Sequence, residues 1–269
     1  MKIKGYRHGA RGFGIRDIQL ILPSVVCSTH VSKKIADAVG GKTFSHNTGC
    51  ALIGSDVPGI GEFFSDLANH PNVSSVVIVG LGCETIQGNE LAIEILKKNE
   101  ATKYLVIQES GGMGATLEKG VAAAREVAQA FPASPSDLDQ VVVGIEYTIK
   151  NEKILELAKA LEASGYLVRT SDSTSTNENF NTLMSAGVHL ILSFVNPQQP
   201  PSGYPIIPVI NIASDSPLHL AIEGDFDLQA NDSISQILEL TSQIASGQKT
   251  KAEVLALGEI FAPRVVRSA

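Results

Sequence analysis

The chain has 269 residues, of which 43% are hydrophobic and 18% charged, which is the balance of a globular protein and excludes a disordered one. Its formal net charge of −7 argues against a nucleic acid or an anionic membrane as partner, since both need basic patches. No apolar run approaches the roughly 20 residues of a membrane-spanning helix, and the basic, glycine-rich N-terminus lacks the apolar core of a signal peptide.

Short β-branched runs alternate with helical patterns along the whole chain. In the first half, the pattern predicts strands at residues 18–22, 42–44, 73–79 and 104–108, and helices at 29–38, 60–67, 89–98 and 117–131. In the second half, it predicts strands at 140–144, 166–169 and 188–195, an extended segment at 206–212 that Pro208 breaks, and helices at 154–163, 180–186, 234–245 and 251–257. This alternation predicts an α/β fold with mostly parallel sheets and flanking helices, similar to a Rossmann fold.

A stretch rich in proline, serine and aspartate, residues 132–139, is the best candidate for a boundary inside the chain. We therefore expect two lobes. Residues 1–139 would form a cysteine-bearing lobe for metal and substrate, and residues 140–269 a second α/β lobe.

All three cysteines follow predicted strands, within the first 83 residues. Ligands of open α/β sheets bind beyond the carboxyl ends of the strands, so we expect Cys27, Cys50 and Cys83 to converge at one sheet edge. Their wide spacing differs from the paired cysteines of zinc ribbons. Three thiolates with an open fourth position suit iron, as a single ion or an iron–sulfur cluster. The alternative is three structural cysteines that behave as small hydrophobic residues.

Three other features have both a functional and a structural interpretation. His46, in a small polar loop, is a metal ligand, a general base or a surface residue. The glycines of residues 108–112 precede a predicted helix and either cradle an anion or form a plain turn. Arg7, Arg11 and Arg16, near the first strand, either recognise a carboxylate or are solvated. Neither a dinucleotide-binding GxGxxG motif nor a P-loop is present.

Several segments together resemble the altronate and galactarate dehydratase family, which is related to the sulfolactate sulfo-lyase large subunit. They are Gly5-Tyr6-Arg7 with Arg11 and Gly14-Ile15-Arg16-Asp17, and the stretches "PSVVCS", "SHNTGC", "HPNVSSVVIVGLGCE", "IQESGG", "GYPIIPVINIASDSP" and "IASGQKTKAE". The resemblance implies an iron-dependent lyase that removes water from a sugar acid, such as an aldonate or aldarate, by β-elimination.

The resemblance also implies roles for individual residues. Iron would be bound by Cys27, Cys50 and Cys83, with His46 beside them. The base that removes the proton would be His46 or Glu84. The residues expected around the carboxylate-bearing substrate are Arg7, Arg16, Ser28, Gln108, Glu109, Gly111 and Gly112.

Two departures from the family keep alternatives open. Where the family carries a motif similar to Q-C-G-G-S-D, this chain reads Gly144-Ile145-Glu146-Tyr147, and the small N-terminal domain of full-length members has no counterpart. We therefore expect a large subunit that works with a small partner subunit. A sulfo-lyase type of elimination and a catalytically inactive metal- or anion-binding relative are the alternatives. A homo-oligomer remains open, and the free thiols favour the cytoplasm.

Overall fold

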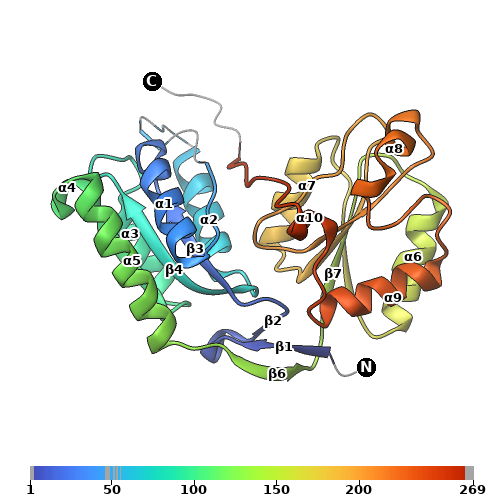
Figure 1. Cartoon of the computed structure of the whole chain (residues 1–269), viewed down its shortest axis with the longest axis horizontal. Helices are drawn as coiled ribbons and strands as arrows, with labels where there is room; N and C mark the ends of the chain where they lie inside the picture. The colour runs from blue at the N-terminus through green and yellow to red at the C-terminus, as the bar shows by residue number, and fades with distance from the viewer. Residues whose placement is uncertain (1–2, 46–48, 51, 53, 55, 264–269) are drawn as a thin grey trace. The chain divides into compact units, whose positions relative to one another are not determined.

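The structure is a computed structural model that describes residues 3–45, 49–50, 52, 54 and 56–263 (Figure 1). The chain forms two compact units. The cysteine unit is built mainly from Arg7–Ser134, and the second unit mainly from Pro135–Glu259. Residues 3–6 group with the second unit and residues 260–263 with the cysteine unit. The division between the units therefore falls five residues before the expected one. In addition, each end of the described chain groups with the unit that contains the other half of the sequence.

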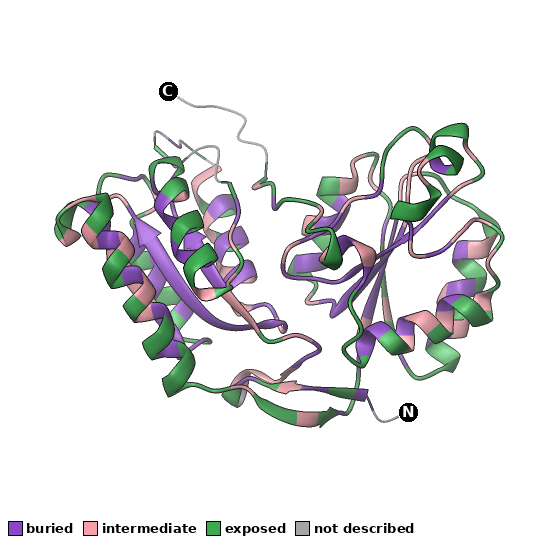
Figure 2. Cartoon of the chain, in the orientation of Figure 1, coloured by how far each residue is buried: buried purple, intermediate pink, exposed green. Residues whose placement is uncertain are grey.

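The cysteine unit contains a parallel three-stranded sheet with the order β3-β4-β5. Its strands are β3 (Ile18–Pro23), β4 (Val73–Gly80) and β5 (Thr102–Val106). Its helices are α1 (Thr29–Val39), α2 (Asp56–Asn69), α3 (Gly88–Leu96), α4 (Ile107–Ser110) and α5 (Met113–Ala130), with the short 3-10 helices η1 (Gly9–Arg11) and η2 (Val26–Ser28). All eight residues of β4 are buried, as expected for a central strand covered on both faces (Figure 2).

The core of this unit forms where α1 and α5 pack on the sheet. Ile35 of α1 and Val127 of α5 belong to one buried cluster with Val77 of β4. Helices α2 and α3 contact one another and the same strands. The register places Pro23 beside Val79, so the carboxyl ends of neighbouring strands share one edge.

The second unit contains a parallel four-stranded sheet with the order β10-β9-β7-β8. Its strands are β7 (Val142–Tyr147), β8 (Leu167–Ser171), β9 (Leu190–Phe194) and β10 (Val209–Ile212). Its helices are α6 (Glu152–Ala163), α7 (Thr176–Ser185), α8 (Pro217–Ala221), α9 (Ile234–Ala245) and α10 (Lys251–Val254), with η3 (Glu223–Asp225). Because β8 lies on one side of β7 and β9 on the other, the winding direction reverses between β7 and β9.

The predicted α/β class with parallel sheets is confirmed, but several elements differ from the expectation. A third sheet, β2-β1-β6, was not predicted. It contains β1 (Ile3–Arg7), β2 (Phe13–Gly14) and β6 (Ser134–Leu138), so the stretch expected as a boundary contains a strand. The expected strand at 42–44 is only an isolated bridge from Lys42 to Leu20.

Two further predicted segments have other bounds than expected. Residues 107–108 begin the helical turn α4 instead of ending β5, because the chain turns sharply toward Gly111 and Gly112. The last strand starts only at Val209, since Pro208 lacks the backbone N–H that a strand ladder uses. Within the part of the chain that the structure describes, no helix combines the length and apolar character needed to cross a membrane.

Candidate functional site

The loops that carry the three cysteines are joined to one another by backbone hydrogen bonds. The N–H of Ser24, after β3, donates to the carbonyl of Val79 at 3.1 Å. In the next loop, Thr85 donates to the carbonyl of Gly49 at 3.0 Å. The N–H of Gln108, after β5, donates to Leu81 at 3.2 Å. The segments that follow β3, β4 and β5 therefore form one connected edge, as parallel-strand topology requires.

The three cysteines are exposed free thiols on this edge. Cys50 makes a side-chain hydrogen bond with Cys83. The pKa of the Cys50 thiol is raised, first by desolvation and then by the charges of Cys27 and Cys83. An electrostatic effect of this kind needs thiols that are neighbours in space, so the structure brings together three cysteines that are far apart in the sequence.

The donor chemistry of this edge fits iron, since thiolates are soft ligands that favour iron and iron–sulfur clusters. No group of three His, Cys, Asp or Glu side chains among the described residues is already arranged as a metal site. The thiols thus lie close together without forming a finished coordination shell. His46, the expected fourth ligand or base, lies outside the described residues.

Glu84 is buried directly behind Cys83, with only 1% of its surface exposed. The hydroxyl of Ser24 donates to its Oε1 at 3.1 Å, and the N–H of Gly82 donates to its Oε2 at 2.6 Å. Both carboxylate oxygens therefore accept hydrogen bonds, one from the end of β3 and one from the loop of Glu84 itself. In this arrangement Glu84 fastens the end of β3 to the loop that presents Cys83, and its role as a base stays a prediction.

Two glycines next to the cysteines are required by the backbone geometry. Gly49 has a φ of 116°, and a Cβ at this position would lie 2.8 Å from the Cα of Val25. Gly82 has a φ of 118°, and its Cβ would lie 2.6 Å from Oε1 of Gln108. Any other residue would be strained at both positions, so glycine is what lets the loops approach one another.

Tyr104 of β5 belongs to this edge but could not be selected from the sequence, where no motif marks it. Burial, and then the charges of Glu84 and Glu109, raise the pKa of Tyr104 to about 12. Its phenol is therefore neutral at physiological pH and can donate a hydrogen bond. Ser24 was also missed, although it stands in the "PSVVCS" stretch, because a serine after a strand is more often a turn residue.

The remaining predicted substrate residues after β5 lie on the same edge. Gln108 and Glu109 are exposed on α4. Gly111 and Gly112 have φ values of 97° and 95°, and Gly112 is the residue before α5. The amino terminus of this 18-residue helix therefore opens at the edge, where its dipole favours an anion. Ser28 differs from the expectation, since it is fully buried and its hydroxyl donates to Val25, inside the turn.

The structure does not bring Arg7 and Arg16 to the cysteines. Arg16 precedes the first residue of β3 and Cys27 follows its last, so the two lie at opposite ends of the strand. The guanidinium of Arg7 lies over the ring of Phe13, 5.5 Å from its centroid. A role for Arg7 or Arg16 toward a substrate at the thiols therefore gains no support from their positions.

A parallel sheet whose carboxyl edge gathers three thiols, a buried carboxylate and a helix amino terminus defines an α/β protein with a ligand-binding or catalytic edge. Two family models match the chain along nearly its whole length. Residues 5–131 match the family described as "D-galactarate dehydratase/Altronate hydrolase, second domain", and residues 146–267 match "D-galactarate/Altronate dehydratase, C-terminal". The chain belongs to the D-galactarate dehydratase/altronate hydrolase family.

Two curated relatives are similar to parts of the chain. The altronate dehydratase of Bacillus subtilis (strain 168) is 27% identical over 158 residues, which are 53% of this chain and 31% of that protein. The altronate dehydratase of Escherichia coli (strain K12) is 29% identical over 97 residues, which are 32% of this chain and 20% of that protein. The matches therefore span less than a third of the length of either relative.

One solved structure covers most of the chain, the solution structure of the E. coli RcsC C-terminus with its linker region and phosphoreceiver domain. It is 15% identical, and the match covers 88% of this chain and 97% of that one. Its TM-score of 0.29 is too low to support any statement about fold or function.

Proposed function

We propose that the chain carries the site of a sugar-acid dehydratase, a hydro-lyase that removes water from an aldonate or aldarate by β-elimination. The observation that carries this proposal is the grouping of Cys27, Cys50 and Cys83 around one sheet edge. Membership of a family named for D-galactarate and altronate dehydratases supports the same substrate class.

Iron is the cofactor that the three thiols would hold, with His46 as an additional ligand or as the base. When bound, it supplies a Lewis acid for the departing β-hydroxyl. The thiols are soft donors on an exposed edge, where a fourth position can stay open for substrate.

The residues of the chain would divide the remaining work between them. The substrate carboxylate would lie at the amino terminus of α5, where the N–H groups after Gly112 face an anion. The exposed Gln108 and Glu109 would bind hydroxyl groups, and the neutral phenol of Tyr104 would donate to a substrate oxygen.

The elimination itself needs one base. His46 or Glu84 would remove the proton from the carbon next to the carboxylate, and the electrons of that C–H bond would form the C=C bond as the β C–O bond breaks. The protonated base would then return its proton to the leaving hydroxide, which departs as water. Glu84 would first have to exchange its hydrogen bond from Ser24 for the substrate proton. The resulting enol would then convert to a keto acid.

Two alternatives remain within the same scaffold. A sulfo-lyase would use the same proton removal, with sulfite leaving in place of water. A non-catalytic metal- or anion-binding relative is favoured by Gly144–Tyr147, where Glu146 is buried at the position of the family's cysteine motif. We further propose a small partner subunit and a reducing, cytoplasmic location, which the exposed free thiols suit.

The proposal is tested by anaerobic purification with added iron, followed by metal analysis, electron paramagnetic resonance and assay of keto-acid formation on a panel of aldonates and aldarates. We expect bound iron that is lost in Cys27→Ser, Cys50→Ser and Cys83→Ser. Met113→Leu, which removes an exposed sulfur from the start of α5, is the matched control and should keep its iron. Folded protein that contains no iron would refute the proposal that the thiols bind iron. Protein that binds iron but shows no turnover, with or without a partner subunit, would favour the alternative of a non-catalytic binding protein.

A further inference from the structure

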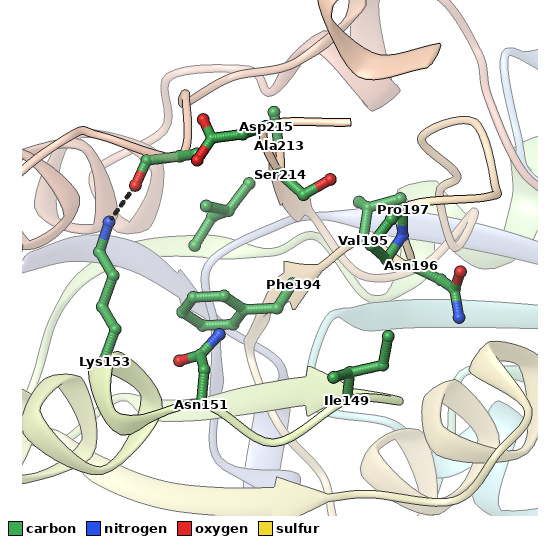
Figure 3. A pocket seen from close by; sticks show the side chains of 12 residues that line it. Ile149, Asn151, Lys153, Phe194, Val195, Asn196, Pro197, Ala213, Ser214 and Asp215 are labelled. Carbon is green, nitrogen blue, oxygen red and sulfur yellow. Dashed lines mark hydrogen bonds between the residues drawn. The ribbon is translucent and has the colours of Figure 1, made fainter. Parts of the chain in front are cut away.

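The second unit has a pocket of its own at the point where its sheet reverses direction. The pocket has a volume of about 240 Å³ and is lined by segments that follow β7, β9 and β10 (Figure 3). β7 and β9 are neighbours in the sheet, but the chain reaches β9 only after adding β8 on the other side of β7. In open α/β sheets, this reversal separates the loops and leaves a crevice that binds ligands.

One wall of the pocket carries a positive charge. Nζ of Lys153, in the first turn of α6, donates to the carbonyls of Ala230 at 2.9 Å and Asp232 at 2.6 Å. No ion pair of Lys153 with a carboxylate is found among the described residues. An ammonium group has three N–H donors, so one remains after these two bonds. The positive end of the α6 dipole lies at the same wall, and both features favour a ligand anion.

The other walls carry groups that recognise hydroxyls. Asp215 and Ser214 follow β10, and Asn196 follows β9. The carboxylate of Asp215 is exposed and accepts only, so it suits a hydroxyl donor. Phe194 lines the same pocket, and its ring offers an apolar surface to carbon atoms (Figure 3).

A buried histidine holds the two polar loops in place. Nδ1 of His219 accepts from the N–H of Ser214 at 2.8 Å, so the ring hydrogen is on Nε2. Nε2 donates to the carbonyls of Asn196 at 3.1 Å and Gln199 at 2.9 Å. The loops after β9 and β10 are therefore fastened to one side chain, and the pocket is formed before any ligand arrives.

The size of the pocket limits what it can hold. Drug-sized ligands occupy pockets of roughly 300–1,000 Å³, and liquid water takes about 30 Å³ per molecule. A pocket of about 240 Å³ thus has room for roughly eight waters or one small metabolite. A dinucleotide would not fit, and no glycine-rich phosphate loop is present.

We propose that this pocket binds a small hydroxylated carboxylate, with the carboxylate at Lys153 and the hydroxyl groups at Asp215 and Ser214. The site belongs entirely to the second unit and contains none of the cysteines. It is therefore independent of the dehydratase proposal, and a ligand can bind here whether or not the thiols hold iron.

Binding is measured by titration calorimetry on the full-length Cys27→Ser variant after treatment with a chelator. This protein separates the pocket from the thiol site. The probes are D-gluconate, which has both chemical features, hexanoate, which has no hydroxyls, and sorbitol, which has no carboxylate. We expect D-gluconate to bind at least about tenfold more tightly than either of the others, a difference of about 1.4 kcal/mol. Equal binding of all three, or no binding of D-gluconate, would overturn the proposal.

Variants locate the binding. Lys153→Met should weaken D-gluconate binding at least tenfold and Lys153→Arg should retain most of it, while Lys159→Met, on an exposed position of α6, should change nothing. Since Lys153→Met also removes two hydrogen bonds, Asp215→Asn provides a second test on an exposed residue, with Asp225→Asn as its control. We expect Asp215→Asn to weaken the binding of D-gluconate and to leave the weak binding of hexanoate unaltered. D-gluconate binding that survives both Lys153→Met and Asp215→Asn would place the ligand elsewhere and refute the assignment.

Discussion

Ser24 donates its hydroxyl hydrogen to Oε1 of Glu84 at 3.1 Å, and this bond joins the carboxyl ends of β3 and β4. Both side chains are buried, with 0% and 1% of their surface exposed. The cysteine that follows each strand therefore depends on a polar contact made beneath it. The thiols stand on loops, but the relative position of those loops is set by a contact between two strand ends.

Replacing Ser24 by alanine should destabilise the protein by about 1–3 kcal/mol, because it leaves one oxygen of the buried Glu84 without its donor. Urea unfolding at neutral pH measures the change. Ser32→Ala is the matched control. Its buried hydroxyl has no hydrogen-bond partner in the part of the chain that the structure describes, so its loss should cost far less. If both variants lose the same stability, the bond to Glu84 contributes nothing specific.

Replacing Gly49 by alanine should cost about 1–3 kcal/mol, because the backbone has a φ of 116° and the new Cβ would press on the Cα of Val25. Since a backbone atom cannot rotate away, the Cys50 loop should shift and iron binding should fall as well. Thermal unfolding and metal analysis follow the two effects. Gly59→Ala lies in α2 with open space at its Cβ, so it should leave stability equal or higher. A Gly49→Ala protein with unchanged stability and unchanged iron content would contradict the claim that alanine is strained at this position.

Glu146 gives a prediction about pH. Burial raises the pKa of Glu146 above its ordinary value of 4.5, and hydrogen bonds from Ser193 and Asn179 offset this only in part. A carboxyl whose pKa is higher in the folded state stabilises the fold below the unfolded pKa. That stability is lost as the pH rises through the folded value.

Glu146→Gln cannot ionise, so its stability relative to the unchanged protein should increase as the pH rises from about 4 toward 8. Urea unfolding of both proteins across this range measures the difference. Burial also raises the pKa of Asp227 and lowers the pKa of His8. Both groups are present in both proteins, so their contributions to stability cancel in the difference. A difference that is independent of pH would show that Glu146 does not titrate in this range.

The positions of Cys27 and Cys83 were predictable because each follows a strand and parallel strands end at the same edge, whereas Cys50 follows only the isolated bridge from Lys42 to Leu20. The grouping of polar side chains around Glu146 was not predictable. The register places four polar residues beside one another across the second sheet, namely Ser171, Glu146, Ser193 and Asn211. Glu146, Ser193 and Asn211 each stand alone within an apolar strand, whereas Ser171 ends the more polar strand β8. Only the pairing of strands far apart in the sequence brings the four together. For Arg16, proximity to β3 in the sequence does not show whether a substrate at the thiols is within reach, because Arg16 precedes the strand and Cys27 follows it.

Arg11 has a structural role at the start of β4, the end of the sheet opposite the cysteines. Its Nη1 and Nη2 donate to the carbonyls of Val73 at 2.7 Å and Ser74 at 2.8 Å, and burial lowers its pKa to about 10. It therefore stays protonated at neutral pH and satisfies two carbonyls at the start of β4.

Arg11→Lys should cost about 1–3 kcal/mol, because a single ammonium cannot reproduce the two parallel bonds of the guanidinium fork. Arg7→Lys is the control. Among the described residues, the side chain of Arg7 makes one hydrogen bond, to the carbonyl of Gly9, which is long at 3.4 Å and exposed, so the change should stay within about 0.5 kcal/mol. Chemical denaturation of both variants decides between the two roles. An Arg11→Lys variant as stable as Arg7→Lys would mean that the two carbonyls at the start of β4 are satisfied equally well without the guanidinium.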